Sequence, residues 1–177
     1  MQNLPLIIQS DKTMLLEVHS PSFPDARDDI APYSELVKSP EHFHTYRISP
    51  LSLWNAVAVG FSSEMIISRL KRWSKYPIPD AVEQFIREFA SRFGRLKLLP
   101  GPDEQSLLLS CGEEKLYQEL KHHRGLQSML TPAGDRSFLL SLYNRGTVKV
   151  TLIKLGHPVE DLIPLRQGTP LTFSLRE

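Results

Sequence analysis

Apolar residues in the first hundred positions change from short alternating runs to a spacing of three and four residues. Alternating runs predict β-strands, whereas the wider spacing predicts amphipathic helices. Prolines that follow polar residues mark helix starts, and glycines mark helix ends. In order, the pattern predicts strands at 6–8 and 14–18, a helix over 22–33, strands at 35–37 and 42–48, and helices over 49–60, 62–74 and 80–94.

Two further strands, at 95–99 and 106–111, follow the last of these helices and are joined by a turn containing two prolines and a glycine. Three helices followed by a β-hairpin is the element order of a winged-helix module. The sequence therefore predicts an N-terminal α/β module over residues 1–98 that contains a winged-helix-like unit of three helices and a hairpin.

A second pattern follows residue 98 and mixes helices with strands. It predicts a helix over 113–123, a short helical piece at 126–130, a loop at 131–135, a strand at 138–143 and a helix over 147–155 that ends at the Gly156-His157-Pro158 stop. Apolar segments at 161–163 and 171–175 come last. We expect a small mixed α/β domain over residues 99–177, which makes the whole chain an α+β protein.

Composition limits the classes of function. The chain has 177 residues, 41% of them hydrophobic, which is enough for a core. Lys and Arg number 21 against 20 Asp and Glu, a net charge of +1, so nucleic acid would have to bind a local patch. A single cysteine, Cys111, excludes an intramolecular disulfide and a zinc site built mainly on thiolates. Neither a signal peptide nor an apolar run of about 18 residues is visible, so we expect a cytoplasmic protein without membrane contact.

No catalytic motif is recognisable. The glycines form no phosphate-binding loop, and G-x-S-x-G and H-E-x-x-H are absent, so we expect no enzymatic activity from this chain itself. His42 and His44 share one strand face, but no Cys or acidic residue has the spacing of a third metal ligand. We interpret them as histidines of a partly buried surface, and Cys111 as a buried, inert thiol. The sequence predicts no metal and no cofactor here.

Basic residues in three regions are candidates for contact with DNA phosphates. One group lies beside Trp73 on the helix over 62–74, a second lies at the end of the following helix and the start of the hairpin, and a third lies in the second unit. For the first group the alternative is a solvated helix face whose long side chains cover Trp73. The DNA-binding candidates are Arg69, Lys71, Arg72, Lys75, Arg92, Arg95, Lys97, Lys121, Arg124, Arg145 and Lys149. The candidates for binding a partner protein through an exposed apolar face are Phe43, Tyr46 and Trp54.

Several residue strings resemble those of XPB-type DNA repair helicases. The most specific runs from Glu41 to Ala56 and reads EHFHTYRISPLSLWNA. Segments 5–18, 31–36, 72–79 and 92–98 accompany it, so that about the first hundred residues resemble the N-terminal region of that family in its bacterial form. Residues 107–111 and 154–162 resemble, more weakly, the damage-recognition domain of the family.

The resemblance implies a parent protein that is a 3′–5′ ATP-dependent DNA helicase of nucleotide excision repair, cytoplasmic and associated with the nucleoid. ATP and Mg²⁺ would bind its motor, whose Walker A, acidic-box and R-E-D motifs have no counterpart in this sequence. We expect a non-catalytic accessory region that contributes DNA or damage recognition and regulates the motor. The alternative is a protein interaction module without autonomous DNA binding. Expected partners are forked, single-stranded or damaged DNA, the motor in cis, and a repair nuclease or a transcription and repair subunit.

Overall fold

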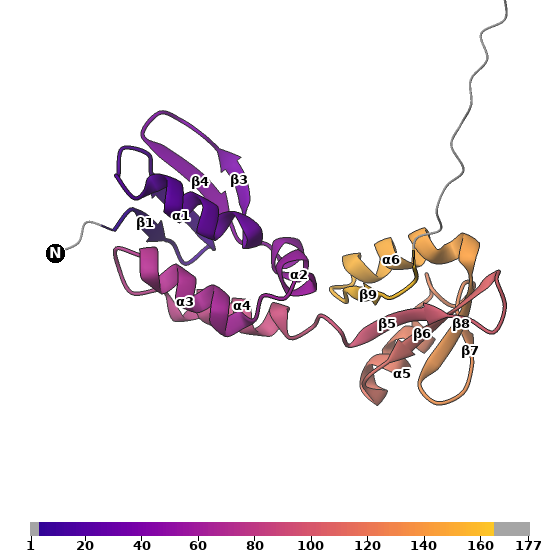
Figure 1. Ribbon diagram of the computed structural model, residues 1–177. Helices are drawn as coiled ribbons and strands as arrows, with labels where there is room; N and C mark the ends of the chain where they lie inside the picture. The colour runs from indigo at the N-terminus through magenta and orange to yellow at the C-terminus, as the bar shows by residue number, and fades with distance from the viewer. Residues whose placement is uncertain (1–3, 165–177) are drawn as a thin grey trace, which may run out of the picture.

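The computed structural model describes residues 4–164 and shows two units, each with its own β-sheet (Figure 1). The apolar segment predicted as a strand at 171–175 lies outside the described residues. The first unit contains, in order, β1 (Leu6–Ile8), β2 (Thr13–Glu17), α1 (Phe23–Ile30), the 3-10 turn η1 (Ala31–Tyr33), β3 (Glu35–Lys38), β4 (Phe43–Arg47), α2 (Pro50–Ala58), α3 (Ser63–Trp73) and α4 (Asp80–Ala90). These elements confirm the predicted order of strands and helices.

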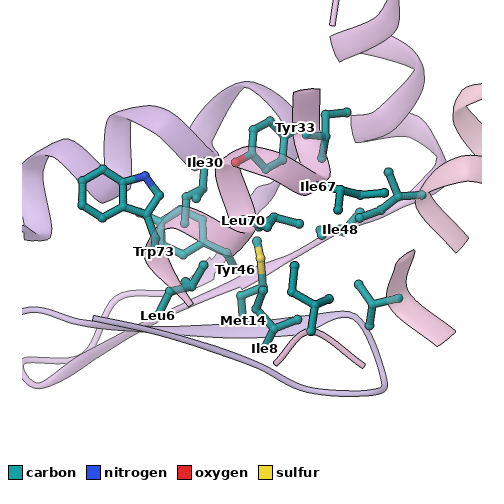
Figure 2. Close-up of a cluster of buried hydrophobic side chains, with 14 of the residues drawn as sticks. Leu6, Ile8, Met14, Ile30, Tyr33, Tyr46, Ile48, Ile67, Leu70 and Trp73 are labelled. Atoms are coloured by element: carbon teal, nitrogen blue, oxygen red, sulfur yellow. The ribbon is translucent and has the colours of Figure 1, made fainter. Parts of the chain in front are cut away.

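The first sheet is antiparallel throughout, with the strand order β1-β2-β4-β3. Alternation along β1 and β2 turns Leu6, Ile8 and Met14 toward the core, because successive side chains of a strand point to opposite faces. Helices α1, α3 and α4 contribute to the same apolar cluster. Figure 2 shows Ile30 and Leu70 above these sheet residues, so the helices bury one face of the sheet.

The start of α2 shows how local sequence determines an element. The backbone N–H of Ser52 donates to the Ser49 hydroxyl at 3.0 Å, and the backbone N–H of Ser49 donates to the Ser52 hydroxyl at 3.0 Å. This reciprocal capping box satisfies two N–H groups that the first helical turn leaves unpaired. Pro50 occupies the first turn, and Gly60, with φ of 99°, follows the end of the helix. The predicted helix start is confirmed.

The second unit is built on a five-stranded mixed sheet with the order β7-β8-β6-β5-β9, in which only β5 and β9 run parallel. Its elements are β5 (Leu96–Pro100), β6 (Ser106–Cys111), α5 (Glu114–His122), β7 (Thr131–Pro132), β8 (Ser137–Ser141), the 3-10 turn η2 (Leu142–Asn144), α6 (Arg145–Lys154) and β9 (Val159–Asp161). Tyr117 of α5 stacks on Phe138 of β8 with ring centroids 4.7 Å apart, inside a second apolar cluster. The predicted mixed sheet is confirmed.

The hairpin of β5 and β6 differs from the winged-helix prediction. Both strands lie in the second sheet, where β6 pairs with β8 and β5 with β9, instead of forming a wing on α2–α4. The physical reason is burial, since Leu96, Leu98, Leu107 and Leu109 all face the second cluster. The boundary predicted between residues 98 and 99 falls inside β5.

The segment between α5 and β8 also differs from prediction. Residues 126–130 form hydrogen-bonded turns instead of a helical piece, with the Leu126 N–H donating to the His123 carbonyl and the Leu130 N–H to the Leu126 carbonyl. Leu126 and Leu130 are buried, so the turns carry both side chains into the core. Part of the predicted loop at 131–135 is β7, which pairs with β8.

Within residues 4–164, no single helix has the length and apolar character needed to cross a membrane. Helices α2 and α3 meet those two criteria only as a pair, with a bend of 112° between them.

Leu70→Ala is expected to lower the free energy of unfolding of the first unit by about 2–5 kcal/mol, because Leu70 has no exposed surface and its truncation leaves a cavity. Leu51→Ala is the matched control, with 47% of Leu51 exposed and an expected loss of at most about 1 kcal/mol. Urea denaturation followed by tryptophan fluorescence measures this unit, since Trp54 and Trp73 both lie in it. Equal losses in the two variants would contradict the packing described.

Candidate functional site

Two cations of α3 form ion pairs with carboxylates of neighbouring helices. The Arg69 guanidinium lies 2.6 Å from Asp29 Oδ1, and the Trp73 indole N–H donates to Asp29 Oδ2 at 2.8 Å. Lys71 Nζ lies 2.7 Å from Glu83 Oε1 of α4. These contacts join α3 to α1 and to α4, so Arg69 and Lys71 have a structural role in addition to any contact with a ligand.

Arg72 and Lys75 lie at the end of the same helix and are exposed. Among the described residues neither has a carboxylate partner. The Arg72 guanidinium lies 4.9 Å from the centroid of the Trp73 ring, which agrees with the alternative interpretation that long side chains cover Trp73. An anion can nevertheless reach both charges. Stacking on an aromatic ring leaves the outer N–H groups of the Arg72 guanidinium available, and the Lys75 side chain is exposed.

The cations between the two units are held by nearby acceptors. Arg92 Nη2 lies 2.5 Å from Glu88 Oε1, and its Nη1 donates to the Gly156 carbonyl at 3.3 Å. Arg95 donates from Nε to the Ser91 carbonyl at 2.9 Å, and its Nη1 lies 3.4 Å from Glu113 Oε1.

The remaining cation of this group, Lys97 on β5, lies with its Nζ 3.5 Å from Glu160 Oε2. Each of these three side chains therefore has a carboxylate within ion-pair distance.

Asp161 binds two of the candidates in the second unit. Its Oδ1 accepts from Arg145 Nη2 at 2.8 Å, and its Oδ2 accepts from Lys149 Nζ at 2.6 Å. Burial raises the pKa of Asp161, but the hydrogen bonds from Lys149 and Arg145 outweigh it, so the pKa lies below the usual value. The charges of Arg145 and Lys149 are therefore paired with Asp161 inside the second unit.

Lys121 and Arg124 complete the set of candidates. Lys121 Nζ lies 5.9 Å from the centroid of the Tyr117 ring, and Arg124 is exposed in the turn after α5. Within residues 4–164 neither has a carboxylate partner. Seven of the eleven candidates are thus bound to carboxylates, and the four that are not form two pairs, Arg72 with Lys75 and Lys121 with Arg124.

The three residues predicted to form an exposed apolar face do not do so. Phe43 is 39% exposed, but Tyr46 and Trp54 are each only 4% exposed. The Trp54 indole N–H donates to the Phe89 carbonyl at 2.9 Å, which turns this ring toward α4, and Tyr46 belongs to the core cluster shown in Figure 2.

Leu36 and Val37, on the edge strand β3, are among the exposed apolar residues that sequence reasoning missed. The register of β3 against β4 shifts between Leu36 and Lys38, so Val37 is the extra residue of a bulge. The proline at position 40, soon after this strand, is a sequence signal that suits an edge.

His42, His44 and Cys111 contact other protein side chains and form no metal or catalytic site among the described residues. His42 Nδ1 lies 2.9 Å from His19 Nε2, whereas the His44 ring packs edge-on against Phe23. In the described part of the chain, no three His, Cys, Asp or Glu side chains are grouped as a metal site. Cys111 is buried, as predicted, and burial raises the pKa of its thiol to about 11, so the reactive thiolate is rare at neutral pH.

A cleft of about 440 Å³ separates α2 from α6 and β9, which face each other across the two units (Figure 1). Leu51 and Phe93 line it on one side, and Ile153 and Leu162 line it on the other. These side chains are apolar, so most of this cleft is unsuited to a phosphate.

Comparison with known proteins relates the chain to DNA helicases. The family described as "Helicase conserved C-terminal domain" matches residues 6–133. The chain is 38% identical to the DNA 3′-5′ helicase XPB of Kineococcus radiotolerans over 98% of this chain and 31% of that protein. It is also 38% identical to the DNA 3′-5′ helicase XPB of Mycobacterium tuberculosis, over 98% of this chain and 32% of that protein.

A eukaryotic relative is the XPB helicase/translocase subunit of general transcription and DNA repair factor IIH from Drosophila melanogaster. It is 38% identical over 72% of this chain and 15% of that protein. The chain thus spans about a third of the length of the bacterial relatives that it matches, and a smaller share of this one.

Replacing Asp161 by Asn is expected to lower the free energy of unfolding at pH 7 by about 1–2 kcal/mol. This is less than the loss of about 3–5 kcal/mol for a fully buried pair, since Arg145 and Lys149 are partly exposed. Because the folded-state pKa of Asp161 is lowered, its contribution is present above about pH 4 and is lost as the pH falls through the folded-state pKa. Urea denaturation followed by circular dichroism from pH 7 downward measures the difference.

Asp135→Asn serves as the control for this experiment, because the Asp135 side chain is 89% exposed and its nearest cation, Arg136, lies 3.7 Å away. We expect no pH-dependent difference for this variant. A difference between wild type and Asp161→Asn that stays constant down to pH 2 would contradict the ionic role of Asp161.

Proposed function

This chain belongs to the helicase conserved C-terminal domain family, and from that membership we propose that it is the accessory, non-catalytic region of an XPB-type 3′–5′ DNA helicase. In this proposal the first unit is the N-terminal module and the second is the damage-recognition-like domain. The bacterial match supports it, because that match covers 98% of the chain and therefore both units. ATP and Mg²⁺ would bind the motor of the same helicase, in the cytoplasm.

We further propose that the region contacts the DNA backbone. The observation that carries this proposal is that four of the eleven candidate cations have no carboxylate partner among the described residues, namely Arg72 and Lys75 in the first unit and Lys121 and Arg124 in the second. Unpaired Lys and Arg can neutralise phosphates and release the counterions condensed on DNA.

Four such cations support weak binding only. If each neutralised one phosphate, the slope of log affinity against log salt would reach about −4 on duplex DNA. The region would therefore bias where the motor engages DNA instead of holding DNA by itself. Preference for a forked or damaged structure would come from the arrangement of the two cation pairs in separate units.

The Arg72→Glu/Lys75→Glu variant is expected to weaken DNA binding by about tenfold or more at low salt, because it replaces two attractive charges by repulsive ones. Fluorescence anisotropy with single-stranded and forked DNA over a salt series measures the affinity. The matched control is Lys38→Glu/Lys154→Glu, which reverses two exposed cations outside the candidate set and is expected to change the affinity much less.

Two results would count against the proposed contact. Wild-type protein that gives no change in anisotropy at micromolar concentration would refute DNA binding by this region. An equal loss of affinity in the Arg72/Lys75 variant and in the control would show a general charge effect instead of a site at the end of α3.

Docking onto the motor is a second candidate function, favoured by the exposed side chains of Leu36, Val37 and Phe43. Leu36 and Val37 lie on the edge strand β3, and Phe43 lies at the start of the neighbouring strand β4. The bulge at Val37 disfavours the addition of a further strand, so contact would be made through side chains. The bacterial relatives are about three times as long as this chain, which leaves room for the motor as the occupant.

Leu36→Asp/Val37→Asp is expected to abolish binding to the separately purified motor of the same helicase, because the variant places charge on an apolar contact. Isothermal titration calorimetry measures this binding. Val59→Asp is the control, since Val59 is 75% exposed at the end of α2, away from β3. Unchanged binding by the double variant would contradict docking through this edge.

A further inference from the structure

A polar hollow of about 330 Å³ lies where the end of α4, the helix α5 and the α6–β9 connection meet. Its charged lining consists of Arg92, Arg95, Lys115, His157, Glu113 and Glu119. Basic side chains therefore outnumber acidic ones by four to two, counting His157. This differs from the apolar cleft on the other side of the same connection, which Leu51 and Ile153 help to line.

Arg92 is held in position at one wall of the hollow. Its guanidinium lies 4.4 Å from the centroid of the Phe89 ring and donates to the Gly156 carbonyl. Gly156 has φ of 83°, and a Cβ at this position would lie 2.9 Å from Arg92 Nη1. Position 156 thus favours glycine for its backbone conformation, and the hydrogen bond from Arg92 to its carbonyl brings the α6–β9 connection against the end of α4.

Arg95 and Lys115 have donors that are weakly engaged. The Nε and Nη2 atoms of Arg95 donate to the Ser91 carbonyl and hydroxyl, which orients the side chain. Its Nη1 lies 3.4 Å from Glu113 Oε1, which is an ion-pair contact and longer than a usual charge-assisted hydrogen bond. Lys115 has no carboxylate partner in the part of the chain that the structure describes.

His157 follows Gly156 in the lining of the hollow, with its Nε2 3.1 Å from Glu119 Oε1 of α5. Its backbone N–H donates to the Leu152 carbonyl at 2.9 Å, so the end of α6 positions the residue. In neutral His157 the single N–H is the one on Nε2, which donates to Glu119, so only the imidazolium form has a second N–H, at Nδ1, for an anion. Donors from the end of α4 and from the second unit therefore line the same hollow.

We propose that this hollow binds one phosphate group of the DNA backbone, with Arg95 and Lys115 as its main ligands and Arg92 and His157 beside them. The planar guanidinium of arginine matches the geometry of phosphate oxygens, and lysine adds a point charge. Glu113 and Glu119 reduce the affinity, so the site suits a phosphate that other contacts already bring close. This inference rests on the proposed DNA contact and adds to it a site that joins the two units.

The position of the ligands has a mechanical consequence. Arg92 follows α4 of the first unit, whereas Lys115 and His157 belong to the second. A phosphate bound both by Arg92 and by the residues of the second unit would favour the relative placement of the units in which these side chains line the same hollow. DNA would then select one arrangement of the two units, because a ligand stabilises the state that it binds more tightly.

Lys115→Gln/Arg95→Gln is expected to weaken DNA binding by about tenfold and to reduce the magnitude of the salt slope by about 1, the value for one phosphate contact. Lys154→Gln/Arg136→Gln removes the same charge from the second unit outside the hollow and should leave the slope unchanged. Lys115→Gln alone should show part of the effect, and it breaks no ion pair among the described residues, so the loss of a structural ion pair does not account for it.

Titration with inorganic phosphate at constant ionic strength distinguishes a site for a DNA phosphate from a site for free phosphate. Calorimetric binding of phosphate that Lys115→Gln abolishes, together with unchanged DNA affinity of that variant, would overturn the assignment to DNA and leave a site for free phosphate. Wild-type DNA binding that neither hollow variant alters would overturn the inference while the proposed DNA contact stands. A wild-type chain that binds no DNA would overturn both.

Discussion

Burial of apolar surface in two separate clusters governs how this chain is arranged. One cluster lies between the first sheet and helices α1, α3 and α4, and the other surrounds the second sheet with α5 and α6. The β5–β6 hairpin follows from this division, because its leucines complete the second cluster. The connection after α4 therefore joins two bodies, and the cleft and the polar hollow both lie beside it.

Charge pairing then decides which surfaces remain available to a ligand. Arg69 and Lys71 connect helices, and Asp161 holds Arg145 and Lys149. Of the eleven candidate cations, those left without a carboxylate partner in the described part of the chain lie at the ends of α3 and α5, and Lys115 adds one more in the hollow between the units. The proposed contact with DNA therefore rests on a few individually placed charges instead of a general positive field.

Features encoded by neighbouring residues could be predicted from the sequence, and those set by distant contacts could not. The Ser49-Pro50 helix start needs only residues of its own first turn. The burial of Trp54 depends on a carbonyl in α4, and the pairing of Arg69 depends on Asp29, forty positions earlier. Alternation in β4 likewise does not show that Tyr46 faces a core made by helices. His157 and Lys115 join the hollow only through the fold, so the sequence alone carried no signal for them.

The single cysteine gives the second unit its own chemical reporter. Cys111 ends β6 with 3% of its surface exposed, and burial raises the pKa of its thiol to about 11. A thiol reagent can therefore reach it only when the strands around it separate, and the labelling rate measures opening of that sheet. Both tryptophans lie in the other unit, so the two halves of one unmutated molecule can be followed independently during unfolding, one by fluorescence and the other by thiol labelling.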